Sequence, residues 1–377
     1  MSNQHPFMHF DVIPDYRQQG KIEHKLTDII LLTICAVLSG QDDWKAIHLY
    51  GQDGQAQLDF LKQFGDFSHG VPSTSTIARA MGMISATRLQ KCFIEWMKDC
   101  TELTKGEVIA IDGKTVRGSY DDSRGLGAIH MVNAFATENG VSLGQHKVYR
   151  KSNEITAIPA LLELLEISGC LVTIDAMGCQ KKIAQKILDK NADYLLAVKG
   201  NQGRLEQAFN NYFDMSMLQN HDGGSYSTQE KSRGRQETRL ALTNTDLSVL
   251  GDVGLEWPEL TTMGIVVSLR QKEEVAKESE FTVRYYISSK ELSAKELLNA
   301  TRSHWLVESM HWSLDTAFGE DASRKRVDEG AENFARIRQM CLNMLKSETI
   351  LKASIKHKRA MCAMNCEYLL KVLASLY

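Results

Sequence analysis

The sequence has few of the features that mark membrane, secreted or zinc-binding proteins. Its longest apolar run, Ile29–Leu38, is far shorter than the ~20 residues that a bilayer-spanning helix needs. The amino terminus shows no basic region followed by an apolar stretch, so no signal peptide is visible. The 8 cysteines include no C-x-x-C pair, and His357, Cys362 and Cys366 fit no standard zinc spacing. We therefore expect a soluble cytoplasmic protein with reduced thiols.

The sequence also has few prolines and a small net charge. Only 5 prolines among 377 residues argue against proline-rich linkers. The net charge of −3 gives no overall attraction to nucleic acid, so any DNA binding needs local basic clusters. The hydrophobic fraction of 43% and the charged fraction of 24% are ordinary for globular proteins. At roughly 100–200 residues per domain, the length predicts two or three domains.

The first hundred residues carry helical patterns. Asp28–Gly40 begins on a residue typical of helix caps and ends on glycine, and its apolar residues run almost all round, which indicates a buried helix. A short helix follows within Gly70–Ile84, with Ser73 or Thr74 as its cap, and then another over 86–100. These helices are consistent with a plain bundle or with a helix-turn-helix-like DNA reader.

After residue 105 short apolar strands alternate with helices, which is typical of an α/β sheet with parallel strand pairs. The pattern predicts strands at 108–113, 170–178 and 193–201, helices at 156–168 and 180–191, and a hairpin of 127–137 with 141–149 around Asn139 and Gly140. Helix resumes at about Ala294, runs past Phe318, and returns at 333–345. We predict a helical domain at 1–104, a catalytic core at 105–200 and 292–345, a β-rich insertion at 201–291 and a basic helical tail at 346–377.

Two aspartates follow apolar strands. Asp112 closes VIAID and Asp175 closes LVTID, each at the carboxyl end of a strand, where open α/β sheets bind ligands. If the two strands are neighbours, the carboxylates lie a few ångströms apart, so one takes up a proton or both share a cation. Hard oxygen ligands of this kind suit Mg²⁺ or Mn²⁺. The alternative is that each aspartate merely caps a turn.

A third acidic residue lies in an unusual helix, RSHWLVESMHWSLDTAFGED. Glu308 shares one helical face with two His-Trp pairs, His304-Trp305 before it and His311-Trp312 after it. A solvent-facing helix would more often carry Lys and Glu pairs. The alternative is an aromatic packing seam that carries a surface glutamate.

The strings AIDGKTVRGSY, KSNEITAIPALLELL, TIDAMGCQKKIA, DYLLAVKGNQG and HWLVESMHW resemble the H-repeat-associated transposases of ISAs-type insertion sequences, over nearly the whole chain. That family belongs with the DDE transposases. The resemblance implies an RNase H-like core with a helical domain before it and a β-rich insertion. It also implies that Asp112, Asp175 and Glu308 are the catalytic acids and hold two divalent ions, Mg²⁺ or Mn²⁺. Double-stranded DNA, as element ends and target, and a homodimer are the partners it implies.

The chain departs from the family pattern after Glu308. Ser309 stands where the family has asparagine, and His311 comes three residues after the glutamate instead of four. One missing residue turns everything beyond it in a helix by ~100°. Thr301, His304 and Asp315 also occupy the offsets at which related cut-and-paste transposases carry Tyr, Arg and Lys.

Basic and polar clusters are the predicted DNA contacts, since phosphate binding depends on local positive charge. They are Lys114, Arg117, Lys199, Asn201, Gln202, Arg233, Arg235, Arg239, His304, Trp305 and Arg324, beside further basic residues at Lys325, Arg326, Lys352, Lys356, Lys358 and Arg359. For each cluster alone, a solvated surface is the simpler interpretation.

The sequence therefore predicts a DDE-type transposase that acts in the cytoplasm on nucleoid DNA. Two alternatives are a catalytically inactive, DNA-binding relic of such an enzyme and a metal-dependent phosphohydrolase of small molecules. The relic differs in lacking metal-dependent cleavage, and the phosphohydrolase differs in having no affinity for DNA.

Overall fold

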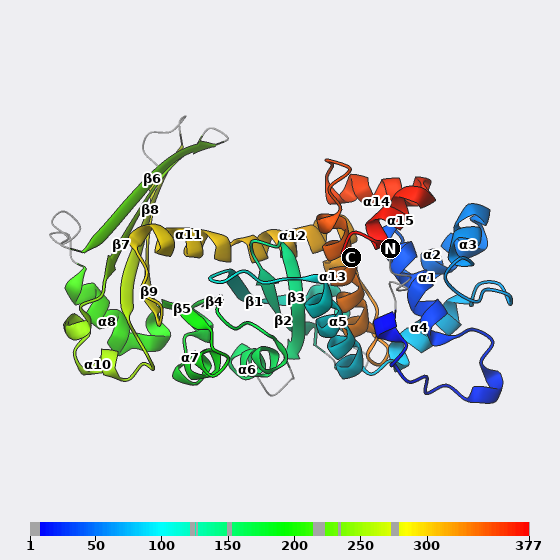
Figure 1. Cartoon of the computed structure of the whole chain (residues 1–377), viewed down its shortest axis with the longest axis horizontal. Coiled ribbons are helices and arrows are strands. Elements are labelled where there is room, and N and C mark those ends of the chain that lie inside the picture. Colours follow the sequence, from blue (N-terminus) through cyan, green and yellow to red (C-terminus); the bar gives the residue numbers. More distant parts are fainter. Residues whose placement is uncertain are drawn as a thin grey trace. The chain divides into compact units, whose positions relative to one another are not determined.

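The computed structural model describes residues 8–120, 125, 127–148, 153–213, 223–232, 235–272 and 279–376. They form two compact units (Figure 1). Unit 1 consists of the residues up to Glu102, Gly113–Lys151 and the residues from Glu308 onward, and unit 2 of Leu103–Asp112 and Ser152–Val307. In the described part of the chain, no helix combines the length and the apolar character needed to cross a membrane.

Unit 2 is built on a mixed sheet with the strand order β1-β4-β5-β9-β8-β7-β6. β1, β4 and β5 are parallel, and the remaining pairs are antiparallel. The bounds of the strands are β1 Val108–Val116, β4 Leu171–Ile174, β5 Asp193–Val198, β6 Gly224–Ser232, β7 Arg235–Asn244, β8 Thr262–Lys272 and β9 Ser279–Ser288. The parallel strands are short and almost wholly apolar because both of their faces are covered.

Helices cover this sheet. They are α6 Glu154–Leu164, α7 Lys181–Leu188, α8 Gly203–Tyr212, the short α10 Asp252–Leu255 and α11 Ala294–His304. In α7, Ile183, Ala184 and Ile187 recur at helical spacing and are buried, so the helix turns one apolar face inward. α11 begins at a capping box of Ser293 and Glu296, and its Leu297 and Leu298 enter the core cluster that includes Leu171 of β4 and Val266 of β8.

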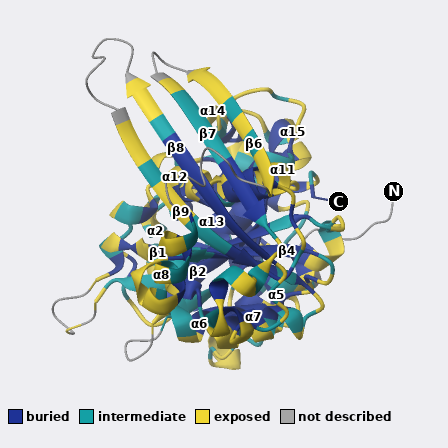
Figure 2. Ribbon diagram, turned by 90° about the vertical axis from the view of Figure 1, so that its left-hand side faces the viewer, coloured by how far each residue is buried: buried dark blue, intermediate teal, exposed yellow. Residues whose placement is uncertain are grey.

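The strands from the predicted insertion continue the core sheet, because β9 pairs with β5 along its carboxyl-terminal half. Beyond the residues where β9 pairs with β5, the strands of the insertion extend away from the buried core of unit 2. Figure 2 shows β7 and β8 changing from buried to exposed along their length, and Phe281 of β9 is 57% exposed. Residues 228–232, 235–239, 268–272 and 279–282 thus form a β-arm that projects from unit 2 (Figure 1).

Unit 1 is mainly helical, with the antiparallel hairpin of β2 Ile129–Ala136 and β3 Val141–Val148 beside the last residues of β1. Its helices are α1 Leu26–Leu38, α2 Trp44–Gln52, α3 Gln55–Leu61, α4 Thr74–Met83, α5 Ala86–Cys100, α12 Leu306–Phe318 (whose first two residues belong to unit 2), α13 Gly330–Ser347, α14 Ile355–Met364 and α15 Cys366–Leu373. α13 is buried over most of its length and packs against α1, α4, α5 and β3. It is the central helix of the unit.

The structure confirms the α/β class and most predicted elements, including the Asn139-Gly140 hairpin turn, where Gly140 has a φ of 70°. The predicted cap at Ser73 is also confirmed. The predicted cap at Asp28 is wrong: Lys25 has the extended backbone of a cap, so the helix begins at Leu26 and Asp28 lies buried in its first turn.

The predicted helix from Ala294 past Phe318 is also wrong in two respects. It is divided at Trp305, where α11 ends and α12 begins. It then stops at Phe318, because Gly319 takes the left-handed conformation with a φ of 57°. The basic residues Arg324–Arg326 therefore lie in a non-helical connection and do not extend the helix that carries Glu308.

Candidate active site and nucleic-acid interface

Asp112 and Asp175 lie on neighbouring parallel strands, Asp112 within β1, which continues to Val116, and Asp175 directly after β4. β1 and β4 pair in register from Val108 opposite Leu171 to Ile111 opposite Ile174, so each aspartate is the next residue after the last pair. Adjacent strands are about 4.8 Å apart, and residues in register point to the same face of a sheet. The predicted position directly after a strand is confirmed for Asp175 and is wrong for Asp112, because β1 continues beyond Asp112 to Val116.

The turn after β4 fixes the Asp175 carboxylate. Its Oδ1 accepts hydrogen bonds from the backbone N–H groups of Met177 at 3.1 Å and Gly178 at 3.3 Å, which caps the 3-10 helix η5, Ala176–Gly178. A side chain at Gly178 would put a Cβ 2.2 Å from Ile174 Cγ2, so only glycine fits this close approach. Burial raises the pKa of Asp175, and the neighbouring Glu154 acts in the same direction. A cation nearby would reverse this effect.

Three of the predicted DNA contacts lie beside this turn. The side-chain amide of Asn201 donates to the carbonyl of Ala176 at 2.6 Å, and that of Gln202 donates to the carbonyl of Cys179 at 2.8 Å. Both amides therefore hold the Asp175 turn in place. Lys199 is exposed, and its charge acts to lower the pKa of Asp175. Of the three, only Lys199 keeps its polar end wholly available for a ligand.

The end of α11 is joined to the same strand. His304 Nδ1 hydrogen-bonds to the Thr173 hydroxyl at 3.0 Å, and burial lowers the pKa of His304 to about 4, so its ring is neutral at pH 7. Thr173 lies two residues before Asp175 and so on the same face of β4. Trp305 is 43% exposed, with the Arg284 guanidinium stacked 5.0 Å from its ring centre. His304 is thus a packing residue, whereas Trp305 stays accessible.

Glu308 is exposed in the first turn of α12. Three residues on, His311 is buried and its Nε2 lies 3.2 Å from the Asn133 amide of β2; burial lowers the pKa of His311 to about 3. Trp312 is 68% exposed. Both histidines are thus engaged within their own units, His304 by Thr173 and His311 by Asn133, whereas Trp305 and Trp312 are exposed.

The structure places two of the three predicted acids on neighbouring strands. Asp112 of β1 and Asp175 after β4 belong to unit 2, while Glu308 is the first residue of the last segment of unit 1. Among the residues that the structure describes, no three His, Cys, Asp or Glu side chains are grouped closely enough to hold a metal ion.

Comparison with known proteins agrees with this architecture. A family model described as "Transposase DDE domain" matches residues 103–344, and one described as "DDE_Tnp_1-associated" matches residues 7–97. The chain belongs to the DDE transposase family. The resemblance drawn from the sequence motifs is therefore confirmed, with the RNase H-like core that it implied. Membership of this family decides against the small-molecule phosphohydrolase.

Two bacterial relatives match almost from end to end. "Putative transposase YncI" of Escherichia coli O157:H7 is 51% identical over 376 residues, which cover 100% of this chain and 96% of the relative. "H repeat-associated putative transposase YhhI" of Escherichia coli K12 is 48% identical over 368 residues, 97% of each chain. Among solved structures, a piggyBac transposase synaptic complex with hairpin DNA matches with a TM-score of 0.44 and 11% identity, over 94% of this chain and 75% of that one.

Lys114 of the transposase is buried and neutralised within unit 1. Its Nζ lies 2.6 Å from Asp315 of α12, 2.9 Å from Glu320 and 3.5 Å from Asp321. The Lys114 side chain is 9% exposed and that of Glu320 is 3% exposed. Burial alone would lower the pKa of Lys114, but Glu320 and Asp315 outweigh it and hold that pKa above its ordinary value. We therefore leave Lys114 out of the proposed DNA surface; Arg117, which is 82% exposed, stays in it.

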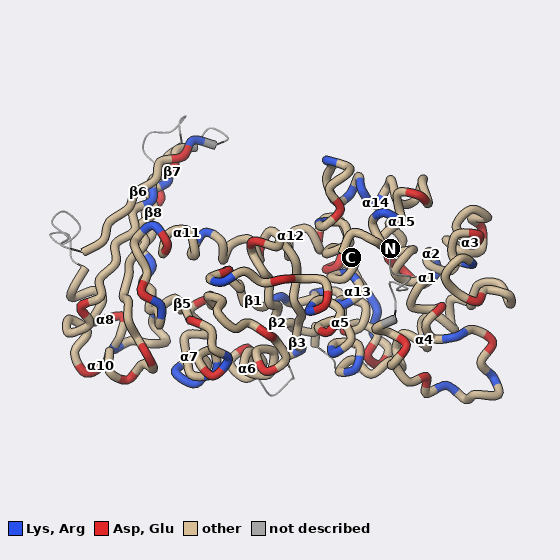
Figure 3. The backbone as a smooth tube through the Cα atoms, in the orientation of Figure 1, with Lys and Arg blue, Asp and Glu red and all other residues tan. Residues whose placement is uncertain are grey.

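The β-arm carries opposite charges in alternation (Figure 3). Arg239 pairs with Glu230 at 3.0 Å and with Glu237 at 2.5 Å, and Arg302 of α11 also reaches Glu230 at 2.5 Å. The Arg239 charge is therefore balanced within the arm. Arg233 lies outside the described residues, and Arg235 is placed only by its backbone in β7. DNA contact by these three arginines stays a prediction.

The basic residues near the carboxyl terminus divide into buried and exposed groups. Arg324, Lys352 and Lys356 are exposed. Lys325 is buried, with its ammonium 3.7 Å from the centre of the Phe334 ring, and Lys358 forms a buried ion pair with Glu348 at 3.1 Å. Of the further basic residues named from the sequence, Lys325 and Lys358 are thus buried and stabilise unit 1.

Arg359 is the clearest of these structural cations. Its guanidinium donates to the Val37 carbonyl at the end of α1 and to Asp42 at 2.7 Å. Replacing Arg359 with methionine should cost about 2–4 kcal/mol of unfolding free energy, because buried acceptors lose their donors. Urea denaturation would measure this cost. Lys356→Met, an exposed position on the same helix, should change the unfolding free energy by less than about 0.5 kcal/mol; equal costs would contradict a structural role for Arg359.

Proposed function

We propose that this transposase is catalytically competent and that Asp112, Asp175 and Glu308 are its acids for cutting and joining DNA strands. The observation that carries the proposal is the in-register pairing of β1 with β4, which ends in Asp112 on one strand and Asp175 on the other. Glu308 follows His304 by four residues, and His304 is bonded to β4 two residues before Asp175. Its place in the chain supports Glu308 as the third acid.

The two aspartates fit a divalent cation. Both offer hard carboxylate oxygens, and neither side chain is fully exposed. Carboxylates on neighbouring strands would repel each other if they shared one site without a cation, and burial already raises the pKa of Asp175. We propose that Asp112, Asp175 and Glu308 would together hold two Mg²⁺ or Mn²⁺ ions. When bound, such ions activate the attacking oxygen and stabilise the leaving one.

The residues of the chain supply orientation and DNA contact. The amides of Asn201 and Gln202 hold the turn that presents Asp175. Exposed cations such as Lys199, Arg117 and Arg324 are our proposed contacts for phosphate, and the exposed ring of Trp305 offers a stacking surface for a base. We propose that the substrate is double-stranded DNA, both element ends and target, in the nucleoid. Pairing two ends calls for a homodimer.

The test uses the full chain and DNA that carries the inverted repeats flanking its coding region. With Mg²⁺ we expect cleavage at the repeat ends and strand transfer to a target plasmid, with none in EDTA. Glu308→Gln should lose at least about 10²-fold of this activity, since even partners of metal ligands are worth 10–100-fold. Ser309→Ala, a neighbouring exposed position, is the matched control and should stay active.

If the chain is instead an inactive relic, the wild type should bind DNA without cutting it. A wild-type chain that binds the repeat DNA yet shows no cleavage in Mg²⁺ or Mn²⁺ would establish the inactive form. Equal activity of wild type and Glu308→Gln would instead remove Glu308 from the acidic set.

A further inference from the structure

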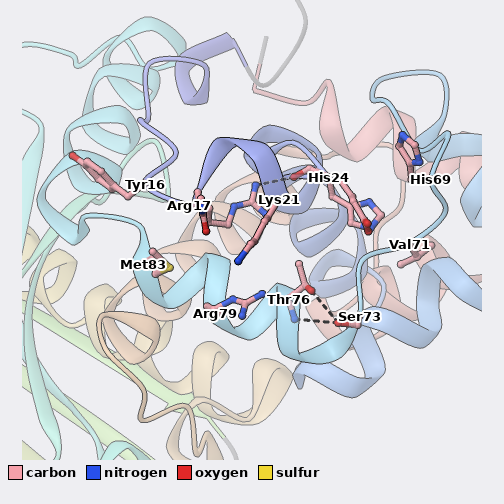
Figure 4. A pocket seen from close by; sticks show the side chains of 12 residues that line it. Tyr16, Arg17, Lys21, His24, His69, Val71, Ser73, Thr76, Arg79 and Met83 are labelled. Carbon is pink, nitrogen blue, oxygen red and sulfur yellow. Dashed lines mark hydrogen bonds between the residues drawn. The ribbon is translucent and has the colours of Figure 1, made fainter.

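A cavity of about 630 Å³ opens within the amino-terminal helices of unit 1, and none of the residues assigned to catalysis above lines it. It lies between the segment of residues 16–24 and helix α4 (Figure 4). Ligand pockets usually have volumes of about 300–1,000 Å³. A single phosphate ion would leave most of this cavity empty.

Two cations line the cavity without forming an ion pair to a described residue. Lys21 and Arg79 are both exposed and both line it, and Figure 4 shows their side chains extending into the space between the two segments. Neither side chain forms an ion pair or hydrogen bond with any residue that the structure describes. Like charges that face one shared space repel each other, and an anion between them removes that repulsion.

Two other polar side chains of the cavity, those of Arg17 and Ser73, already have partners. The Arg17 guanidinium is held by Asp15 at 2.6 Å and by the His24 carbonyl at 2.7 Å. The Ser73 hydroxyl caps α4 by accepting from the Thr76 N–H at 3.3 Å. Arg17 is therefore fixed in direction, while Lys21 and Arg79 are left for a ligand.

The walls favour an anion that also has a planar, apolar part. Among the described lining residues, Glu23 is the only acidic one. Tyr16 stands at the rim with 58% of its surface exposed. Cations interleaved with an exposed aromatic ring are typical of surfaces that follow a nucleic-acid strand, because the cations bind phosphate and the ring stacks on a base or sugar.

We propose that this cavity binds consecutive phosphates of a DNA strand, with Lys21 and Arg79 as the phosphate ligands and Tyr16 against the adjoining nucleoside. The proposal rests on the proposed function, because it takes DNA as the substrate. It adds a DNA-holding site to the amino-terminal helices, separate from the carboxylates that would cut the strand.

The experiment compares two double variants of the full chain by fluorescence anisotropy with a labelled duplex over a range of salt. Lys21→Ala/Arg79→Ala empties the cavity of its unpaired cations. Lys62→Ala/Arg88→Ala removes one lysine and one arginine at exposed positions of the same helical region that do not line the cavity. The cavity variant should bind about tenfold more weakly, and the slope of log affinity against log salt should fall by about two. The matched control should lose less than about twofold.

The possible results of these titrations distinguish the proposal from its alternatives. Equal losses in the two variants, or no loss in the cavity variant with an unchanged thermal melt, would overturn the proposal. A second arm titrates inorganic pyrophosphate: if the cavity variant loses pyrophosphate binding but keeps its DNA affinity, the site serves a small anion and the proposal is wrong. If the wild type binds no DNA, the proposed function fails together with this inference.

Discussion

Replacing Asp175 with asparagine should abolish strand cleavage while leaving the fold intact. The asparagine Oδ1 can still accept from the Met177 and Gly178 N–H groups, so the cap of η5 survives. The fold does not need the charge, since burial already disfavours it and raises the pKa of the carboxyl. What is lost is an anionic metal ligand. We expect cleavage in Mg²⁺ to fall by at least about 10²-fold, with an unchanged melting temperature in EDTA.

Asp246→Asn is the matched control for this substitution. Asp246 also caps a 3-10 helix, Leu247–Leu250, by accepting from the Ser248 N–H at 3.1 Å, but it lies at the surface, in the connection between β7 and β8. If capping were the role of Asp175, the two variants would behave alike. Full activity in Asp175→Asn would remove Asp175 from the catalytic set, and a lowered melting temperature would show that the turn alone had been damaged.

Local patterns in the sequence were sufficient to predict that Asp112 and Asp175 follow apolar segments of parallel strands. VIAID and LVTID are apolar, rich in β-branched residues and followed by a polar residue, and the alternation with helices makes their strands parallel. The strand pairing of β1 with β4 was therefore predictable, whereas the continuation of β1 to Val116 was not, because Asp112 and Gly113 look like a strand end. The hairpin at Asn139-Gly140 was predictable for the same reason, because its signal lies within a few residues.

Features that depend on distant partners were missed. Lys114 follows Asp112 by two residues and looks like a surface cation, yet its partners lie more than 200 positions away in the sequence, at Asp315 and Asp321. Arg359 likewise looks solvent-exposed in a lysine-rich tail until α14 is seen packed against α1. Charge patterns indicate exposure on average, and they fail where a buried carboxylate or a helix-end carbonyl neutralises the cation.

The division of the Glu308 helix was missed for a different reason. The sequence SHWLVES contains no glycine or proline, the usual signals of a helix end. The break at Trp305 instead accompanies two tertiary contacts: the His304 ring bonds to Thr173, and the Trp305 ring lies under Arg284. Tertiary packing overrides local propensity here, at the position that precedes the proposed catalytic glutamate.

Lys114→Met should destabilise unit 1 by about 3–5 kcal/mol, the cost typical of leaving a buried charge without its partner. Glu320, whose side chain is only 3% exposed, would lose the ammonium at 2.9 Å, and Asp315 of α12 would lose its contact at 2.6 Å. Because the folded pKa of Lys114 is raised, this stabilisation should be present below its ordinary value of 10.5 and disappear as the pH rises beyond it. Urea denaturation of both chains at pH 8 and above pH 10.5 would measure the difference.

Arg117→Met provides the control, since Arg117 contacts the same Asp321 at 3.5 Å but is 82% exposed. Its loss should change the unfolding free energy by less than about 1 kcal/mol, as for other surface ion pairs. The double variant Lys114→Met/Glu320→Gln removes both buried charges and should be more stable than Lys114→Met alone, which would demonstrate the coupling directly. Equal effects of Lys114→Met and Arg117→Met would show that burial adds nothing to this ion cluster. Lys114 would then return to the set of possible DNA contacts, and α12, which carries Glu308, would need another anchor to β1.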